Sequence, residues 1–258
     1  MKLKSVIHFI VLFYVVFSSA NVAIAQSKTK IGLRFAPSLS TTRVRMVSDE
    51  EPAQYDSYKS GLNFSAGINA DFYFGQNYAF GTGLWYTGKR LGVKENVTKR
   101  VNGVLTVNSE TISVNSNQYL QIPLTLKLFT NEVTPDMKVF FQLGGLLDIK
   151  LSENLTTWRS SAQERKPKDN AYNALGTSLY LGSGVEYQLG ENTVLFGGIS
   201  YQRKLTNTLS KDGPFPNNSA TDDDTELVTS IRKERDLNAR KAYSVFGDLV
   251  SLEIGIKF

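Results

Sequence analysis

Single charged residues recur among small and polar neighbours, in segments where every second residue is apolar. These residues are Arg34, Lys127, Asp148, Glu186 and Glu253, together with Lys150. Charges of both signs can line a gated polar passage, or they can pair with one another and fill a narrow interior. Because a buried charge without a partner is costly, we expect the second role, a structural network of ion pairs.

The residue types offer little for other chemistry. The chain has 258 residues, no cysteine and one histidine, His8. Thiolate metal sites, disulfides and cysteine nucleophiles are therefore excluded. The acidic run Asp222-Asp223-Asp224 lacks the spaced ligands and turn glycine of a calcium loop, and no nucleophile elbow or phosphate loop is visible. We expect no catalytic residue, no cofactor and no metal site.

Residues 1–25 have the features of a cleaved signal peptide. Lys2 and Lys4 precede an apolar run over about residues 6–17, and residues 23–25 form an A-x-A cleavage pattern. The alternative is a membrane anchor, but the run is too short to span roughly 30 Å of hydrocarbon. Cleavage would remove His8 and would lower the formal charge from +5 to about +3. No face is dense in lysine and arginine, so nucleic acid is not an expected partner.

The rest of the chain, residues 26–258, alternates between apolar and polar residues with the period of a β-strand. The clearest case, LNFSAGINADFYF over residues 62–74, is long for a soluble strand but suits a tilted membrane strand. Eight segments share this pattern: residues 30–36, 62–74, 78–88, 119–128, 138–151, 176–189, 193–204 and 249–258.

The connections between these segments alternate strictly between short and long. Short turns are expected at residues 75–77, 131–137 and 190–192, and long polar connections at residues 37–60, 89–117, 152–174 and 206–241. This order predicts an all-β fold, an eight-stranded antiparallel up-and-down barrel with both termini at the short-turn rim. In an outer membrane the short turns would be periplasmic and the long loops extracellular.

Alternation alone does not decide which face points inward, because a soluble lipocalin-like barrel has its apolar face inside. The outer face of a soluble barrel contacts water and should therefore be dense in lysine and glutamate. The polar face here is mostly glycine, serine, asparagine, glutamine, threonine and tyrosine, which suits the narrow interior of a small barrel. We therefore expect the apolar face to contact outer-membrane lipid in a Gram-negative envelope.

More specific expectations concern four residues. Closure of the barrel joins the first and last strands, which predicts a contact between Arg34 and Glu253 inside it. Trp85 falls on the polar face and should pack in the lumen. Pro123 lacks an N–H group within a predicted central strand, so a bulge or a local break of the ladder is expected there.

Several of these segments carry a family resemblance. YLQIPLTLKLF (119–129), FFQLGGLLDIKL, GSGVEYQL, GGISYQRKLTN and the terminal LVSLEIGIKF resemble, in order, strands of the PorT-like outer-membrane β-barrel family of Bacteroidetes. Lys204 stands where that family commonly has glycine. The resemblance implies an outer-membrane barrel and a link to protein secretion. The terminal Phe258 resembles the signal by which barrel-assembly machinery recognises its substrates.

These observations favour a non-enzymatic integral outer-membrane protein. We expect a structural or interaction role in the cell envelope or in secretion, exercised through the long surface loops and an envelope or secretion partner. A small transporter or pore is the first alternative, although eight strands leave little open lumen. A membrane-embedded enzyme is the second, and the absence of a histidine from the mature chain counts against most such chemistry.

Overall fold

The computed structural model describes residues 29–46, 53–101, 104–160, 172–209 and 243–258. Within them the chain forms nine strands: β1 Thr29–Met46, β2 Ala53–Ser57, β3 Gly61–Tyr73, β4 Tyr78–Val101, β5 Val104–Phe129, β6 Met137–Ser160, β7 Leu175–Gln188, β8 Val194–Lys204 and β9 Tyr243–Lys257. The expected signal peptide, the acidic run and most of the 206–241 connection lie outside the described residues. No helix in the described ranges is long and apolar enough to cross a membrane.

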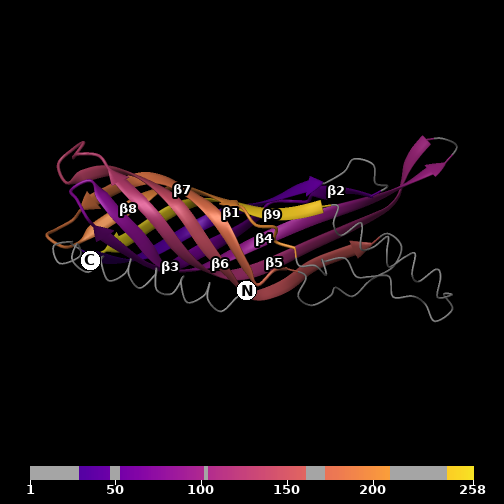
Figure 1. Cartoon of the computed structure of the whole chain (residues 1–258), viewed down its shortest axis with the longest axis horizontal. Coiled ribbons are helices and arrows are strands. Elements are labelled where there is room, and N and C mark those ends of the chain that lie inside the picture. The colour runs from indigo at the N-terminus through magenta and orange to yellow at the C-terminus, as the bar shows by residue number, and fades with distance from the viewer. Residues whose placement is uncertain (1–28, 47–52, 102–103, 161–171, 210–242) are drawn as a thin grey trace, which may run out of the picture.

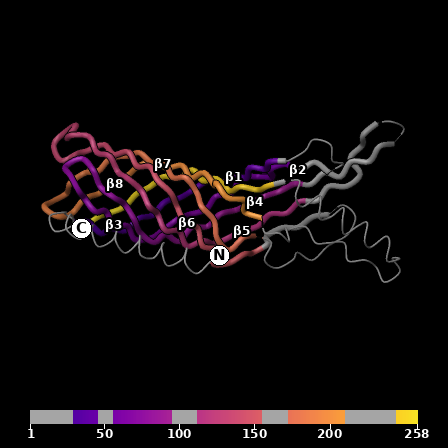
Figure 2. Tube along the Cα trace, viewed as in Figure 1, coloured from indigo at the N-terminus to yellow at the C-terminus, as the bar shows by residue number. Residues whose placement is uncertain are grey.

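Eight of these strands close into one antiparallel barrel (Figures 1 and 2). From β3 to β9 each strand pairs with the next, and β1 joins the two ends by pairing with both β3 and β9. At the closure Leu33 lies opposite Ile256 and Phe35 opposite Ile254. The eight predicted strands are β1 and β3 to β9, so the predicted architecture is confirmed.

The two faces of the barrel differ as the alternation predicts. In β1, Leu33 is 58% exposed on the outer surface, whereas the neighbouring Arg34 is 3% exposed. The same contrast holds around the barrel, and the outward apolar residues include Phe64, Ile68, Leu84, Leu124, Leu143, Leu181, Ile199, Leu252 and Ile254. The apolar face therefore points outward, which excludes a lipocalin-like arrangement and gives a belt suited to lipid.

The two rims also differ. The turns after β3, β5 and β7 are short, and they lie with the start of β1 and the end of β9 at one rim, which we call the short-turn rim. The ends of β1, β4, β6 and β8 lie at the opposite rim, which we call the long-loop rim. The predicted sidedness of the connections thus holds.

The prediction of a long loop at residues 89–117 is wrong. β4 continues to Val101 and β5 begins at Val104, so that nearly all of this segment is a paired hairpin. β1 likewise continues to Met46 and β6 to Ser160, and β2 adds a short strand to β4. The strands outlast the apolar alternation because ladder hydrogen bonds join backbones and do not require apolar side chains.

Pro123 interrupts one of its two ladders. On the β6 side it stays paired, opposite Leu146. On the β4 side, pairing runs to Thr82 opposite Leu124 and resumes at Trp85 opposite Gln121, with no change of register. The expected break of the ladder is therefore present, and bulging occurs elsewhere, with register shifts between Val97 and Thr98 and at two points of β5.

Candidate functional site: the charged lumen

The interior of the barrel holds three groups of buried charges, which we name by their level between the rims. The lower cluster, nearest the short-turn rim, consists of Asp71, Lys127, Glu186 and Lys257. The middle cluster consists of Arg34 and Glu253. The upper cluster, towards the long-loop rim, consists of Lys89, Asp148 and Lys204. All of these side chains project from the inward face of a strand.

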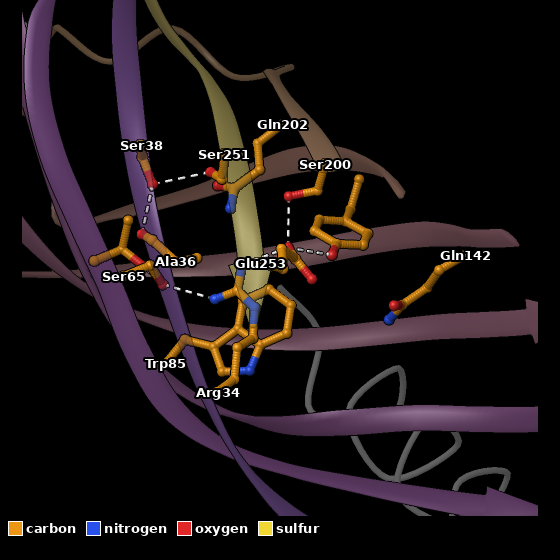
Figure 3. Close-up of polar contacts among 12 residues, drawn as sticks. Arg34, Ala36, Ser38, Ser65, Trp85, Gln142, Ser200, Gln202, Ser251 and Glu253 are labelled. Atoms are coloured by element: carbon orange, nitrogen blue, oxygen red, sulfur yellow. Dashed lines mark hydrogen bonds and ion pairs between the residues drawn. The ribbon is translucent and has the colours of Figure 1, made fainter. Parts of the chain in front are cut away.

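The middle cluster joins the first and last strands (Figure 3). A guanidinium nitrogen of Arg34 lies 2.5 Å from Glu253 Oε1, and the other donates to Ser65 Oγ at 2.9 Å. The guanidinium carbon lies 4.0 Å from the centre of the Trp85 ring. Glu253 Oε1 also accepts hydrogen bonds from Tyr180 OH at 2.7 Å and from Ser200 Oγ at 2.5 Å. Both charges are therefore paired and further stabilised by neutral groups.

In the lower cluster two carboxylates share two ammonium groups. Asp71 Oδ2 lies 2.8 Å from Lys127 Nζ and 2.5 Å from Lys257 Nζ, and Lys257 also pairs with Glu186. Phe196 lies close to both lysines, with its ring centre 5.0 Å from Lys257 Nζ. The cluster is electrically balanced and rests against aromatic rings, an arrangement that favours buried cations.

The upper cluster has two lysines and one carboxylate. Asp148 accepts from Gln121 Nε2 at 2.5 Å and from Ser178 Oγ at 2.7 Å, and it pairs with Lys204. Lys89 Nζ lies 3.6 Å from Asp148 Oδ2, which is an ion pair but exceeds hydrogen-bond reach. This cluster therefore carries one positive charge more than it carries negative charge.

Apolar side chains close the lumen above and below these clusters. At the long-loop end, Leu91, Val93, Tyr172, Leu209 and Val245 pack together, and we call them the upper seal. Burial raises the pKa of the Tyr172 phenol, so it stays neutral at physiological pH. At the short-turn end, Ala79, Phe129, Phe140 and Phe196 form the lower seal. Between the seals lies a third apolar group of Trp85, Leu146 and Tyr180.

The structure places all five predicted site residues in the lumen, in three separate groups. It brings Arg34 and Glu253 into direct contact. It places Lys127 and Glu186 in one cluster, where Asp71 and Lys257 link them. Lys150 lies outside the three clusters, at the long-loop rim. It pairs with Glu153 at 2.8 Å and donates to the carbonyl of Tyr172 at 2.6 Å.

Four charged members of the network escape the sequence prediction: Asp71, Lys89, Lys204 and Lys257. Asp71 and Lys257 lie on the polar faces of predicted strands, so the parity of their positions could have found them. Lys204 ends a predicted strand on its inward side. Lys89 lies one residue beyond a predicted strand, and only the continuation of β4 brings it inside the barrel.

Every carboxylate of the three clusters is engaged by at least one cation. Among the described residues, no group of three or more histidine, cysteine, aspartate or glutamate side chains could hold a metal ion. The arrangement therefore suits electrostatic cross-linking of adjacent strands and of strands that are separated by one other strand.

The chain is similar to the crystal structures of Neisserial surface protein A (12% identity, TM-score 0.37, covering 89% of this chain and 97% of that one) and of the N-terminal β-barrel domain of Pseudomonas aeruginosa OprF (7%, 0.35, 90% and 100%). It is also similar to the outer membrane protease OmpT of Escherichia coli (10%, 0.49, 90% and 96%).

No curated protein matches the chain in sequence. The family described as the outer membrane protein beta-barrel domain matches residues 24–210, which is well over half of the chain. The outward apolar belt and the closed eight-stranded barrel are the features that such a domain requires. The chain belongs to the outer membrane protein beta-barrel domain family.

Proposed function

We propose that this protein is a non-enzymatic structural or interaction component of the outer membrane, which acts through its long-loop rim on the outside of the cell. The observation that carries the proposal is the difference between the lumen and the long-loop rim. The lumen is filled by paired charges between two apolar seals, whereas the strands at one rim continue well past the apolar belt.

The extended strands supply a surface for interaction. β4, β5 and β6 have 24, 26 and 24 residues, whereas about 9–11 residues are enough to cross a membrane. The excess lies at the long-loop rim, where the β4–β5 hairpin projects beyond most of the barrel (Figure 1). Strand pairing of this kind holds the backbone in a fixed register, and that favours specific recognition.

Shortening this hairpin should abolish partner binding without unfolding the barrel. Lys94 and Ile112 lie opposite each other, so an Asn-Gly turn between them can replace residues 95–111. Envelope proteins that co-purify with a tagged wild-type protein should be lost from the shortened variant, as measured by quantitative mass spectrometry. Heat-modifiable gel mobility checks that the barrel still folds. The same set of proteins with both forms would contradict the proposal.

A solute pore is the alternative that the lumen disfavours. Eight strands enclose a space that side chains can fill, and here Trp85, Tyr180, Gln121 and Asp148 occupy its middle with at most 2% exposure. We therefore expect the purified protein to give no conductance above background in planar lipid bilayers. Steady single-channel currents would overturn this expectation and revive transport.

The finer assignment follows from the sequence. The strand motifs that resemble the PorT-like family support a role in the envelope or in protein secretion in a Bacteroidetes-type cell. The basic and apolar N-terminal residues support export by a cleaved signal peptide, and Phe258 supports recognition by barrel-assembly machinery. The pairing of the lumen carboxylates supports a structural role for the predicted charge network and supports the absence of catalysis.

A further inference from the structure

Buried polar atoms without hydrogen-bond partners are concentrated in one part of the lumen. In the described residues such atoms number eleven, and nine of them lie between Asp148 and the upper seal or at the seal itself. They belong to Lys89, Ser113, Asn115, Asn117, Tyr119, Tyr172, Gln202 and Thr208. The lower cluster has none of them. Because buried polar groups are nearly always hydrogen-bonded, this level of the barrel is built to hold something more than its own side chains.

Four of the unpartnered atoms are donors around the upper cluster. They are Lys89 Nζ, Asn117 Nδ2, Tyr119 OH and Gln202 Nε2, and each side chain is at most 3% exposed. Asn117 lies directly opposite Lys89 in the β4–β5 ladder, and Tyr119 follows on the same face of β5. Lys89 Nζ and Lys204 Nζ lie 5.5 and 5.6 Å from the centre of the Tyr119 ring. Gln202 accepts from Gln121, which in turn donates to Asp148.

The upper cluster carries a net positive charge, as the binding of an anion requires. Lys89 and Lys204 face the single carboxylate of Asp148. Two other ion pairs at this end of the barrel, Lys150 with Glu153 and Arg43 with Asp248, are each electrically neutral. A single excess positive charge, buried and surrounded by donors, is neutralised by one monovalent anion and overcompensated by a divalent one.

We propose that the upper lumen binds a small monovalent inorganic anion of the chloride class, held by Lys89 with Asn117, Tyr119 and Gln202. The anion completes the hydrogen bonding of the lysine and cancels the surplus charge of the upper cluster. The upper seal, with Leu91 and Val245 fully buried, shields the site from the long-loop rim and admits only a small ion. The bound ion thereby ties β4, β5 and β8 together.

The proposal predicts anion-specific stability. In detergent micelles, the thermal unfolding midpoint of the wild-type protein should rise saturably with sodium chloride, by about 5 °C, relative to sodium gluconate at equal ionic strength. Lys89→Met leaves a neutral Asp148–Lys204 pair, so its midpoint should not respond to chloride. Lys59→Met, the same substitution at an exposed lysine, is the control and should respond like the wild type.

Bromide tests the site in the wild-type protein, so this test does not depend on whether a variant folds. Crystals of the wild-type protein grown in bromide should show an anomalous peak within hydrogen-bond distance of Lys89 Nζ. An equal chloride response in the wild-type and Lys89→Met proteins would overturn the proposal. So would bromide-grown crystals with only ordered water at Lys89.

Discussion

Replacement of Glu253 by alanine is expected to lower the free energy of unfolding by about 3–5 kcal/mol. The carboxylate pairs with Arg34 and accepts hydrogen bonds from Tyr180 and Ser200, all within the lumen. Its removal leaves the Arg34 guanidinium buried without its counter-ion and deprives two hydroxyl groups of an acceptor. Urea unfolding of the protein in phospholipid vesicles, followed by tryptophan fluorescence, measures the change.

Ser251→Ala provides the matched control for this prediction. Ser251 lies two residues before Glu253 on the same inward face of β9, is equally buried, and makes a single neutral hydrogen bond to Ser38 at 2.9 Å. Its loss should cost only about 1 kcal/mol. The double variant Arg34→Met with Glu253→Leu should recover much of the loss, because no unpaired charge remains. The idea of an electrostatic cross-link fails if Glu253→Ala costs no more than Ser251→Ala.

Arginine in place of Ile199 should destabilise the barrel by about 2–4 kcal/mol. Ile199 lies at the centre of β8, points outward and is 61% exposed on the protein surface. In a bilayer this position lies near the middle of the apolar belt, where a guanidinium has no water and no counter-charge. The same vesicle-based urea titration measures the loss.

Leu205→Arg is the control that distinguishes the effect of depth in the bilayer from the effect of introducing an arginine. Leu205 follows the end of β8 at the long-loop rim and is 57% exposed, close to the value for Ile199. An arginine there reaches the interface, so the expected cost is only about 0–1 kcal/mol. Equal costs at the two positions would contradict the assignment of the outer face to lipid.

The strands and their faces could be predicted from the sequence because both depend on local geometry. Successive side chains of a strand point to opposite faces, so residues 62–74 already separate the lipid side from the lumen side. Tyr119, Trp85 and the five predicted charges follow this parity and are buried. The short turns could be predicted for the same reason. A hairpin turn of a few polar residues joins two consecutive strands, and its conformation does not depend on distant parts of the chain.

The length of the hairpin from β4 to β5 could not be predicted in this way. Beyond residue 94 the paired residues are mostly polar, so the regular apolar alternation disappears while the backbone ladder continues. The polar composition therefore predicted a loop. In the structure β4 and β5 instead pair with each other through this segment, and their backbone hydrogen bonds extend the sheet. Lys89 was lost from the predicted network by the same error.

The sequence by itself determined that the chain forms an outward-apolar barrel and that its isolated charges face inward. The tertiary structure decided which charges meet. Arg34 and Glu253 lie on strands that closure makes neighbours, so their contact could be expected. Lys257 on β9 meets Asp71 on β3 and Glu186 on β7, neither of which is a ladder neighbour of β9. Lys89 on β4 and Lys204 on β8 both meet Asp148 on β6 in the same way. Such contacts depend on the tilt and stagger of all eight strands, which no single strand specifies.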